Sequence, residues 1–75
     1  MKSKTEKVLK EIEQDFKKTF PGFSYSIEYL NPTGDYIFMA DKRISDTKKF
    51  LRWVGKMNDK LFKEDVNNIR IIEEI

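Results

Sequence analysis

The sequence predicts an α+β fold, a two-layer sandwich with two helices on one face of a three-stranded sheet. Apolar residues recur at helical spacing in two long segments, and short β-type segments lie between and after them. The resulting element order is α-β-β-α-β. The 75 residues form one domain, residues 1–75, because a second core would need a longer chain.

The first helix is expected at about residues 4–20. "SKTE" at 3–6 fits a capping box, in which Ser3 accepts from an early backbone N–H and Glu6 reaches back. Pro21 and Gly22 end the helix, since proline cannot continue the hydrogen-bond ladder. The apolar stripe consists of Val8, Leu9, Ile12, Phe16 and Phe20.

Residues 23–30 alternate with a period of two, which indicates a strand. "NPTGD" suits a tight turn, and the return strand covers residues 36–42, making an antiparallel hairpin. The alternation directs Tyr25, Ile27 and Tyr29 toward the helices. A four-residue turn at 31–34 also puts Tyr36 and Phe38 on the core side, leaving Ile37 and Met39 outward. A turn one residue longer or shorter reverses that assignment.

The second helix opens at "SDT", residues 45–47, and continues to about Lys63. Leu51 and Phe62 flank its apolar stripe on one side, and Trp53 flanks it on the other. Gly55 costs about 1 kcal/mol relative to Ala in a helix, which indicates a close approach at that position. The main stripe consists of Phe50, Val54, Met57 and Leu61.

The segment "NIRIIEE" favours a short last strand because it is rich in β-branched residues. A terminal helical turn is the alternative, since Val66, Ile69 and Ile72 also fit a three-residue step.

Composition argues against catalysis. The chain has no histidine and no cysteine, which removes the common general base, thiolate nucleophiles and the preferred zinc ligands. Glu11 and Asp15 lie one turn apart and are expected to pair with lysines of their own helix. We therefore expect no enzyme activity, no metal and no cofactor. With no apolar run long enough for a membrane span, we expect a soluble, cytoplasmic protein without a membrane partner.

The run "YIFMA" has no polar break, so the open sheet face should carry apolar side chains. One interpretation is that such a face binds another protein or a second copy of the chain. The other is that the aliphatic stems of Glu28 and Arg70 and the termini screen a small patch. Because the hairpin register is open at this point, the candidates for protein interaction are Leu30, Tyr36, Ile37, Phe38, Met39 and Ile72.

Residues 42–63 hold the positive charge, with eight Lys or Arg against two Asp, a net of +6. A row of cations beside an aromatic ring suits a phosphate backbone with a base stacked on the ring. The alternative is an ordinary solvent face, with Trp53 at the edge of the core. The candidates for nucleic-acid binding are Lys42, Arg43, Lys49, Arg52, Trp53, Lys56, Lys60 and Lys63.

The element order is similar to the type II KH arrangement, α-β-β-α-α-β, in topology only. A KH domain carries a GxxG loop between two helices, whereas "GKMN" has one glycine inside what reads as a single helix. No KH residues are therefore carried over. The sequence predicts a non-catalytic binding module that uses the open sheet face for a protein partner or itself. A nucleic-acid- or ribosome-associated binder using the second helix is the alternative.

Overall fold

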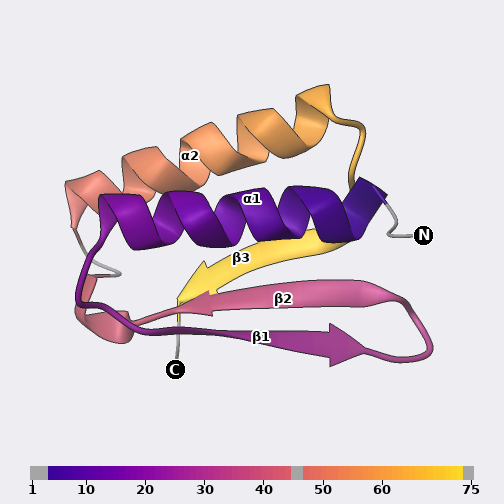
Figure 1. Ribbon diagram of the computed structural model, residues 1–75, viewed down its shortest axis with the longest axis horizontal. Helices are drawn as coiled ribbons and strands as arrows, with labels where there is room; N and C mark the ends of the chain where they lie inside the picture. The colour runs from indigo at the N-terminus through magenta and orange to yellow at the C-terminus, as the bar shows by residue number, and fades with distance from the viewer. Residues whose placement is uncertain (1–3, 45–46, 74–75) are drawn as a thin grey trace.

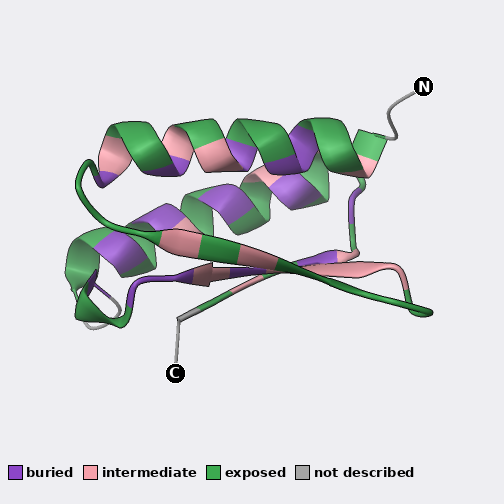
Figure 2. Ribbon diagram, turned by 60° about the horizontal axis from the view of Figure 1, so that its bottom comes forward, coloured by how far each residue is buried: buried purple, intermediate pink, exposed green. Residues whose placement is uncertain are grey.

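The computed structural model describes residues 4–44 and 47–73 and confirms the predicted element order. Both helices lie on one face of the sheet (Figures 1 and 2). Strand β2 is central, paired antiparallel with β1 and parallel with β3. The elements are α1 (Lys4–Thr19), β1 (Tyr25–Leu30), β2 (Asp35–Ala40), the short 3-10 helix η1 (Lys42–Ile44), α2 (Lys48–Lys63) and β3 (Ile69–Glu73).

The helix ends follow local chemistry. Thr47 caps α2, because its hydroxyl accepts a hydrogen bond from the N–H of Phe50 at 3.2 Å. At the other end, the backbone N–H of Glu64 bonds the carbonyl of Lys60. The proposed capping residue Ser3, and the first two residues of "SDT", lie outside the described residues.

The last segment is a strand, not a helical turn, because β3 pairs with β2 along its length. Asn68, just before β3, ties three parts of the chain together. Its side-chain N–H donates to the carbonyl of Gly34 at 3.0 Å, and its Oδ1 accepts from the Thr5 hydroxyl at 3.0 Å. Its own carbonyl accepts from the N–H of Tyr36 at 2.8 Å. These bonds link α1, the hairpin turn and the start of β3.

The hairpin has the four-residue turn, since Leu30 pairs with Asp35 across residues 31–34. The side chains of Tyr36 and Phe38 therefore face the helices, and those of Ile37 and Met39 face outward. Phe38 is fully buried. The prediction of Phe38 as a protein-interaction residue on the exposed sheet face was therefore wrong. Tyr36 lies on the same core side and is half-buried against the core cluster.

Tyr29 lies on the helix side of β1, as the alternation predicts, but the helices do not cover it. It is 54% exposed, although Tyr25 and Ile27 on the same strand face pack against the core as predicted. The physical reason is the sheet twist, which carries the hairpin end of β1 away from the helices (Figure 2). Tyr29 packs there on the ring of Tyr36, with centroids 4.9 Å apart.

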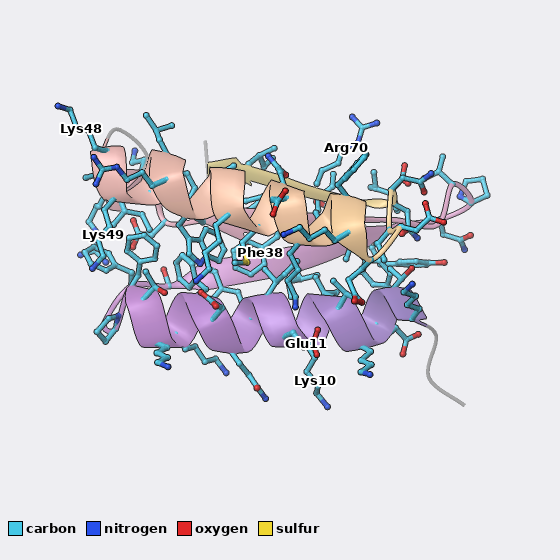
Figure 3. All side chains as sticks on the ribbon, turned by 90° about the horizontal axis from the view of Figure 1, so that it is seen from above. Lys10, Glu11, Phe38, Lys48, Lys49 and Arg70 are labelled. Atoms are coloured by element: carbon cyan, nitrogen blue, oxygen red, sulfur yellow. The ribbon has the colours of Figure 1, made fainter. Side chains whose placement is uncertain are left out.

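An aromatic cluster forms the centre of the core, beneath and between the helices (Figure 3). The ring of Phe16 lies 5.4 Å from Phe38 and 5.3 Å from Trp53, both close to edge-to-face. Trp53 is only 3% exposed. It therefore has no free ring face for stacking a base, which corrects its assignment as a nucleic-acid-binding residue and places it in the core instead.

Candidate protein-interaction surface

The sheet face opposite the helices is the candidate interaction surface, and we call it the open face. Glu28, Ile37 and Arg70 form one row across the three strands in the observed register. Ser26, Met39 and Ile72 form the next row. Leu30 follows beyond Glu28 on β1, opposite Asp35. The structure thus brings together four of the predicted interaction residues: Leu30, Ile37, Met39 and Ile72.

Exposure on the open face is moderate. Leu30 is 36% exposed and Ile72 39%, while Ile37 and Met39, on the central strand, are half-buried between their neighbours. Glu28 and Arg70 are exposed and stand on either side of Ile37. The face is therefore apolar along its middle, negative on the β1 side and positive on the β3 side.

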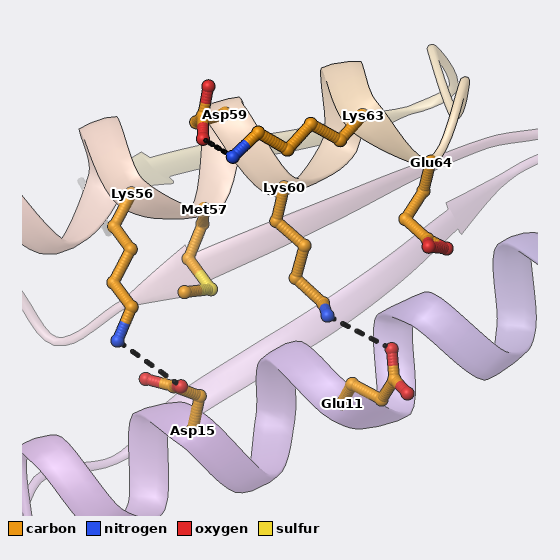
Figure 4. A pocket seen from close by; sticks show the side chains of 8 residues that line it. All are labelled: Glu11, Asp15, Lys56, Met57, Asp59, Lys60, Lys63 and Glu64. Atoms are coloured by element: carbon orange, nitrogen blue, oxygen red, sulfur yellow. Dashed lines mark ion pairs between the residues drawn. The ribbon is translucent and has the colours of Figure 1, made fainter.

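The basic residues of α2 partly face α1, where acidic side chains meet them. Lys60 Nζ lies 3.2 Å from Glu11 Oε1, and Lys56 Nζ lies 3.9 Å from Asp15 Oδ2 (Figure 4). Glu11 and Asp15 thus pair across the helix interface, which corrects their expected pairing within α1. These side chains line a groove of about 550 Å³ between the helices.

Two of the other predicted nucleic-acid-binding residues also contact side chains of this chain. Lys63 pairs with Asp59 on its own helix at 3.0 Å. Lys49 lies over the ring of Phe20, 5.3 Å from its centroid. Lys42 and Arg52 are exposed. The eight residues therefore do not form one open stripe, because some face α1 and Trp53 is inside the core.

Trp53 and Asp15 form a polar contact at the edge of the core. The indole Nε1–H donates to Asp15 Oδ1 at 2.8 Å, and the Thr19 hydroxyl donates to the same oxygen at 3.1 Å. Since a buried indole N–H needs a partner, this bond accounts for the position of Asp15 beside α2.

Asp41 and Arg43 form a second polar cluster, where β2 leaves the sheet. The Arg43 guanidinium binds both carboxylate oxygens of Asp41, and its backbone N–H donates to Oδ1 at 2.9 Å. Asp41 is 7% exposed. The hydrogen bonds from Arg43 hold the pKa of that carboxyl well below its usual range. Arg43 also lies over the ring of Phe23, 5.1 Å from its centroid, so this candidate cation serves the fold locally.

Tyr36 also has a shifted pKa. Burial raises the pKa of its phenol, and the nearby Glu6 carboxylate and Tyr29 add to the effect. The neutral phenol is the form that suits its position against the core.

The outer face of α2 carries two large apolar side chains that were placed only on the flank of the core stripe. Leu51 is 62% exposed and Phe62 is 85% exposed. Their eleven-residue separation puts them on the same helix face, a signal available from the spacing alone.

Across the described ranges, 4–44 and 47–73, no three acidic, His or Cys side chains converge as metal ligands. Within the same ranges no helix combines the length and apolar character needed to cross a bilayer. Comparison with protein-family models, curated proteins and solved structures finds no match for this chain.

Proposed function

We propose that this protein is a non-catalytic interaction domain that binds a second copy of itself through the open face. The observation that supports it is the row Glu28–Ile37–Arg70, in which opposite charges stand on either side of an apolar residue. Glu28 and Arg70 have no ion-pair partner among the described residues of this chain.

This arrangement is self-complementary. Adjacent strands lie about 4.8 Å apart, so Glu28 and Arg70 are displaced by similar amounts to opposite sides of Ile37. When two copies face each other about a two-fold axis parallel to β2, Glu28 of one copy lies opposite Arg70 of the other. Ile37 and Met39 then meet their counterparts near the axis, as an isologous interface requires.

The size of the face sets the expected strength. Three strands of about five residues give a surface about 14 Å wide and 17 Å long, roughly 240 Å² before side-chain relief. A standard protein–protein interface buries about 800 Å² on each partner. We therefore expect a weak, concentration-dependent dimer, in which the two charge pairs determine orientation more than affinity.

The structure offers less support for nucleic-acid binding through α2. Trp53 is buried, and Lys56, Lys60 and Lys63 each lie against a carboxylate. A phosphate backbone would have to compete with those carboxylates for the same ammonium groups.

Charge reversal tests the dimer. Molar mass is measured by light scattering and sedimentation from about 10 µM to about 1 mM, at low and high salt. The expected result is a dimer that Glu28→Arg or Arg70→Glu weakens and the double variant restores, since the double swap recreates both opposite-charge pairs. Ile37→Lys/Met39→Lys should abolish it while circular dichroism stays native. Lys7→Glu, an exposed change on α1, is the matched control.

Two results would refute self-association through this face. One is a wild-type chain that remains monomeric at the highest concentration. The other is a dimer that the double swap fails to restore, because its interface then lies elsewhere. Binding of single-stranded RNA that falls steeply with salt, and again in Arg52→Glu/Lys56→Glu, would favour the nucleic-acid alternative.

A further inference from the structure

A second surface lies on the outer side of α2, away from both α1 and the sheet. Leu51, Gly55, Asn58 and Phe62 fall within about 60° of one another at 100° per residue. All four are exposed, and we call them the outer stripe. An amphipathic helix normally buries its large apolar residues, so Leu51 and Phe62 on the solvent side are unexplained by the fold itself.

Gly55 lies in the middle of the outer stripe. The sequence indicated a close approach there. Among the described residues, however, no atom apart from its chain neighbours and the nearby backbone of α2 lies within 4 Å of where its Cβ would be. The fold therefore gives no internal reason for glycine at a helical position that costs about 1 kcal/mol relative to Ala. A glycine between two large apolar residues lets another helix backbone come close, with its side chains packing beside Leu51 and Phe62.

The charged side chains beside the outer stripe indicate which kind of helix would bind there. The helical positions on one side carry Lys48, Arg52, Lys56 and Lys63, with Asp59 the one acid among them. Lys48 points away from α1 (Figure 3). Lys56 and Lys63 already lie against carboxylates of this chain. Lys48 and Arg52 are therefore the cations of this basic flank that complement acidic residues on an incoming helix.

A second copy packed antiparallel fits the outer stripe poorly. Two antiparallel α2 helices related by a two-fold axis would bring each basic flank against the same flank of the other copy. Like charges at such a contact oppose association. The charge pattern thus separates this surface from the open face, where the charges are self-complementary.

We propose that the outer stripe docks an amphipathic helix of another protein, with acidic residues along the edge that lies over Lys48 and Arg52. Its apolar residues pack between Leu51 and Phe62, over Gly55. A hollow of about 220 Å³ lined by Leu61, Phe62, Asp65, Val66 and Asn67 lies beside the C-terminal end of the stripe. It offers room for a further side chain of the docked helix.

The test is a selection from a phage-displayed library of randomised helical 18-residue peptides, against the full chain. We expect enriched peptides with apolar residues at helical spacing and acids on one edge. The binding of synthetic versions of the selected peptides is then measured by fluorescence anisotropy. The variant Leu51→Ser/Phe62→Ser should no longer bind these peptides. Gly55→Leu should weaken it at least tenfold by blocking the approach. Lys48→Glu/Arg52→Glu should weaken it similarly and select basic-edged peptides instead. Lys7→Glu on α1 is the matched control, with no change expected.

Each variant alters exposed side chains, and circular dichroism with thermal unfolding checks that each remains folded. Failure to enrich any peptide, or peptides that bind Leu51→Ser/Phe62→Ser as well as wild type, would overturn the proposal. A self-association that disappears in Leu51→Ser/Phe62→Ser would also overturn it, because the occupant would then be a second copy.

Discussion

Neighbouring residues of β2 should respond very differently to substitution, and this tests the register on which both the core and the open face depend. Phe38 is fully buried, with its ring 5.0 Å from that of Tyr25 and 5.8 Å from that of Trp53. Ile37 faces the other way and is half-buried. Removing the ring with Phe38→Ala should cost about 3–5 kcal/mol. Ile37→Thr, which keeps the β-branched shape, should cost about 0.5 kcal/mol.

The size of the chain makes that contrast measurable. At roughly 0.05–0.15 kcal/mol per residue, 75 residues give a total free energy of unfolding of about 4–11 kcal/mol. Phe38→Ala therefore removes a large part of the stability, and Phe38→Leu, expected to cost about 1–2 kcal/mol, keeps enough fold for a full transition.

Urea unfolding, followed by fluorescence of the single tryptophan, Trp53, provides the assay. With a slope of about 1 kcal/mol per molar urea, Phe38→Leu should lower the midpoint by about 1–2 M and Ile37→Thr by about 0.5 M. Working at about 1 µM protein keeps any self-association from contributing by mass action. Equal shifts for the two positions, or a larger shift for Ile37, would show that the assigned register is wrong.

Three further predictions concern local features. Asp41→Asn should remove part of the acid sensitivity of folding. Arg43 lowers the pKa of Asp41 in the folded state. The carboxylate therefore stabilises the fold at pH values above 3.8, the ordinary pKa of the group, and this contribution is lost as the pH falls further. When the free energy of unfolding is measured from pH 7 to pH 2, it should fall less steeply in Asp41→Asn than in the wild type. Identical pH dependences for the two proteins would contradict this. Gly55→Ala should stabilise the chain by up to about 1 kcal/mol, since the new methyl meets no described residue beyond the nearby backbone of α2; a lower melting temperature would count against it. Asp15→Ala should cost about 1–2 kcal/mol by leaving the indole N–H of Trp53 without its acceptor, whereas an unchanged urea midpoint would mean that this bond contributes nothing.

Local periodicity was enough to predict the elements and their order. The 3.6-residue spacing of Ile12 and Phe16 in α1, and of Met57 and Leu61 in α2, specified which helix faces would be buried. The period-two pattern before "NPTGD" specified a strand for the same reason. These patterns are readable without a structure because the backbone geometry of an isolated helix or strand sets them.

The faces of the sheet depended on pairing, which a single segment does not encode. A change of one residue in the turn would have exchanged Phe38 with Ile37, and the four-residue turn, with Asn68 bound to Gly34, selects the observed alternative. Tyr29 shows the same dependence, since its alternation was read correctly but the twist moved it beyond the reach of the helices.

The α-β-β-α-β order, the two amphipathic helices and the continuous apolar central strand could be predicted from the residues alone, because those features follow from short-range spacing. The contacts of the charged and aromatic side chains of α2, in contrast, depend on how the two helices pack. The Trp53 ring is buried because α1 packs beside α2, and Lys56 and Lys60 meet Asp15 and Glu11 across that junction. Such contacts join residues more than 35 positions apart, and they exist only once both helices have packed on the same face of the sheet.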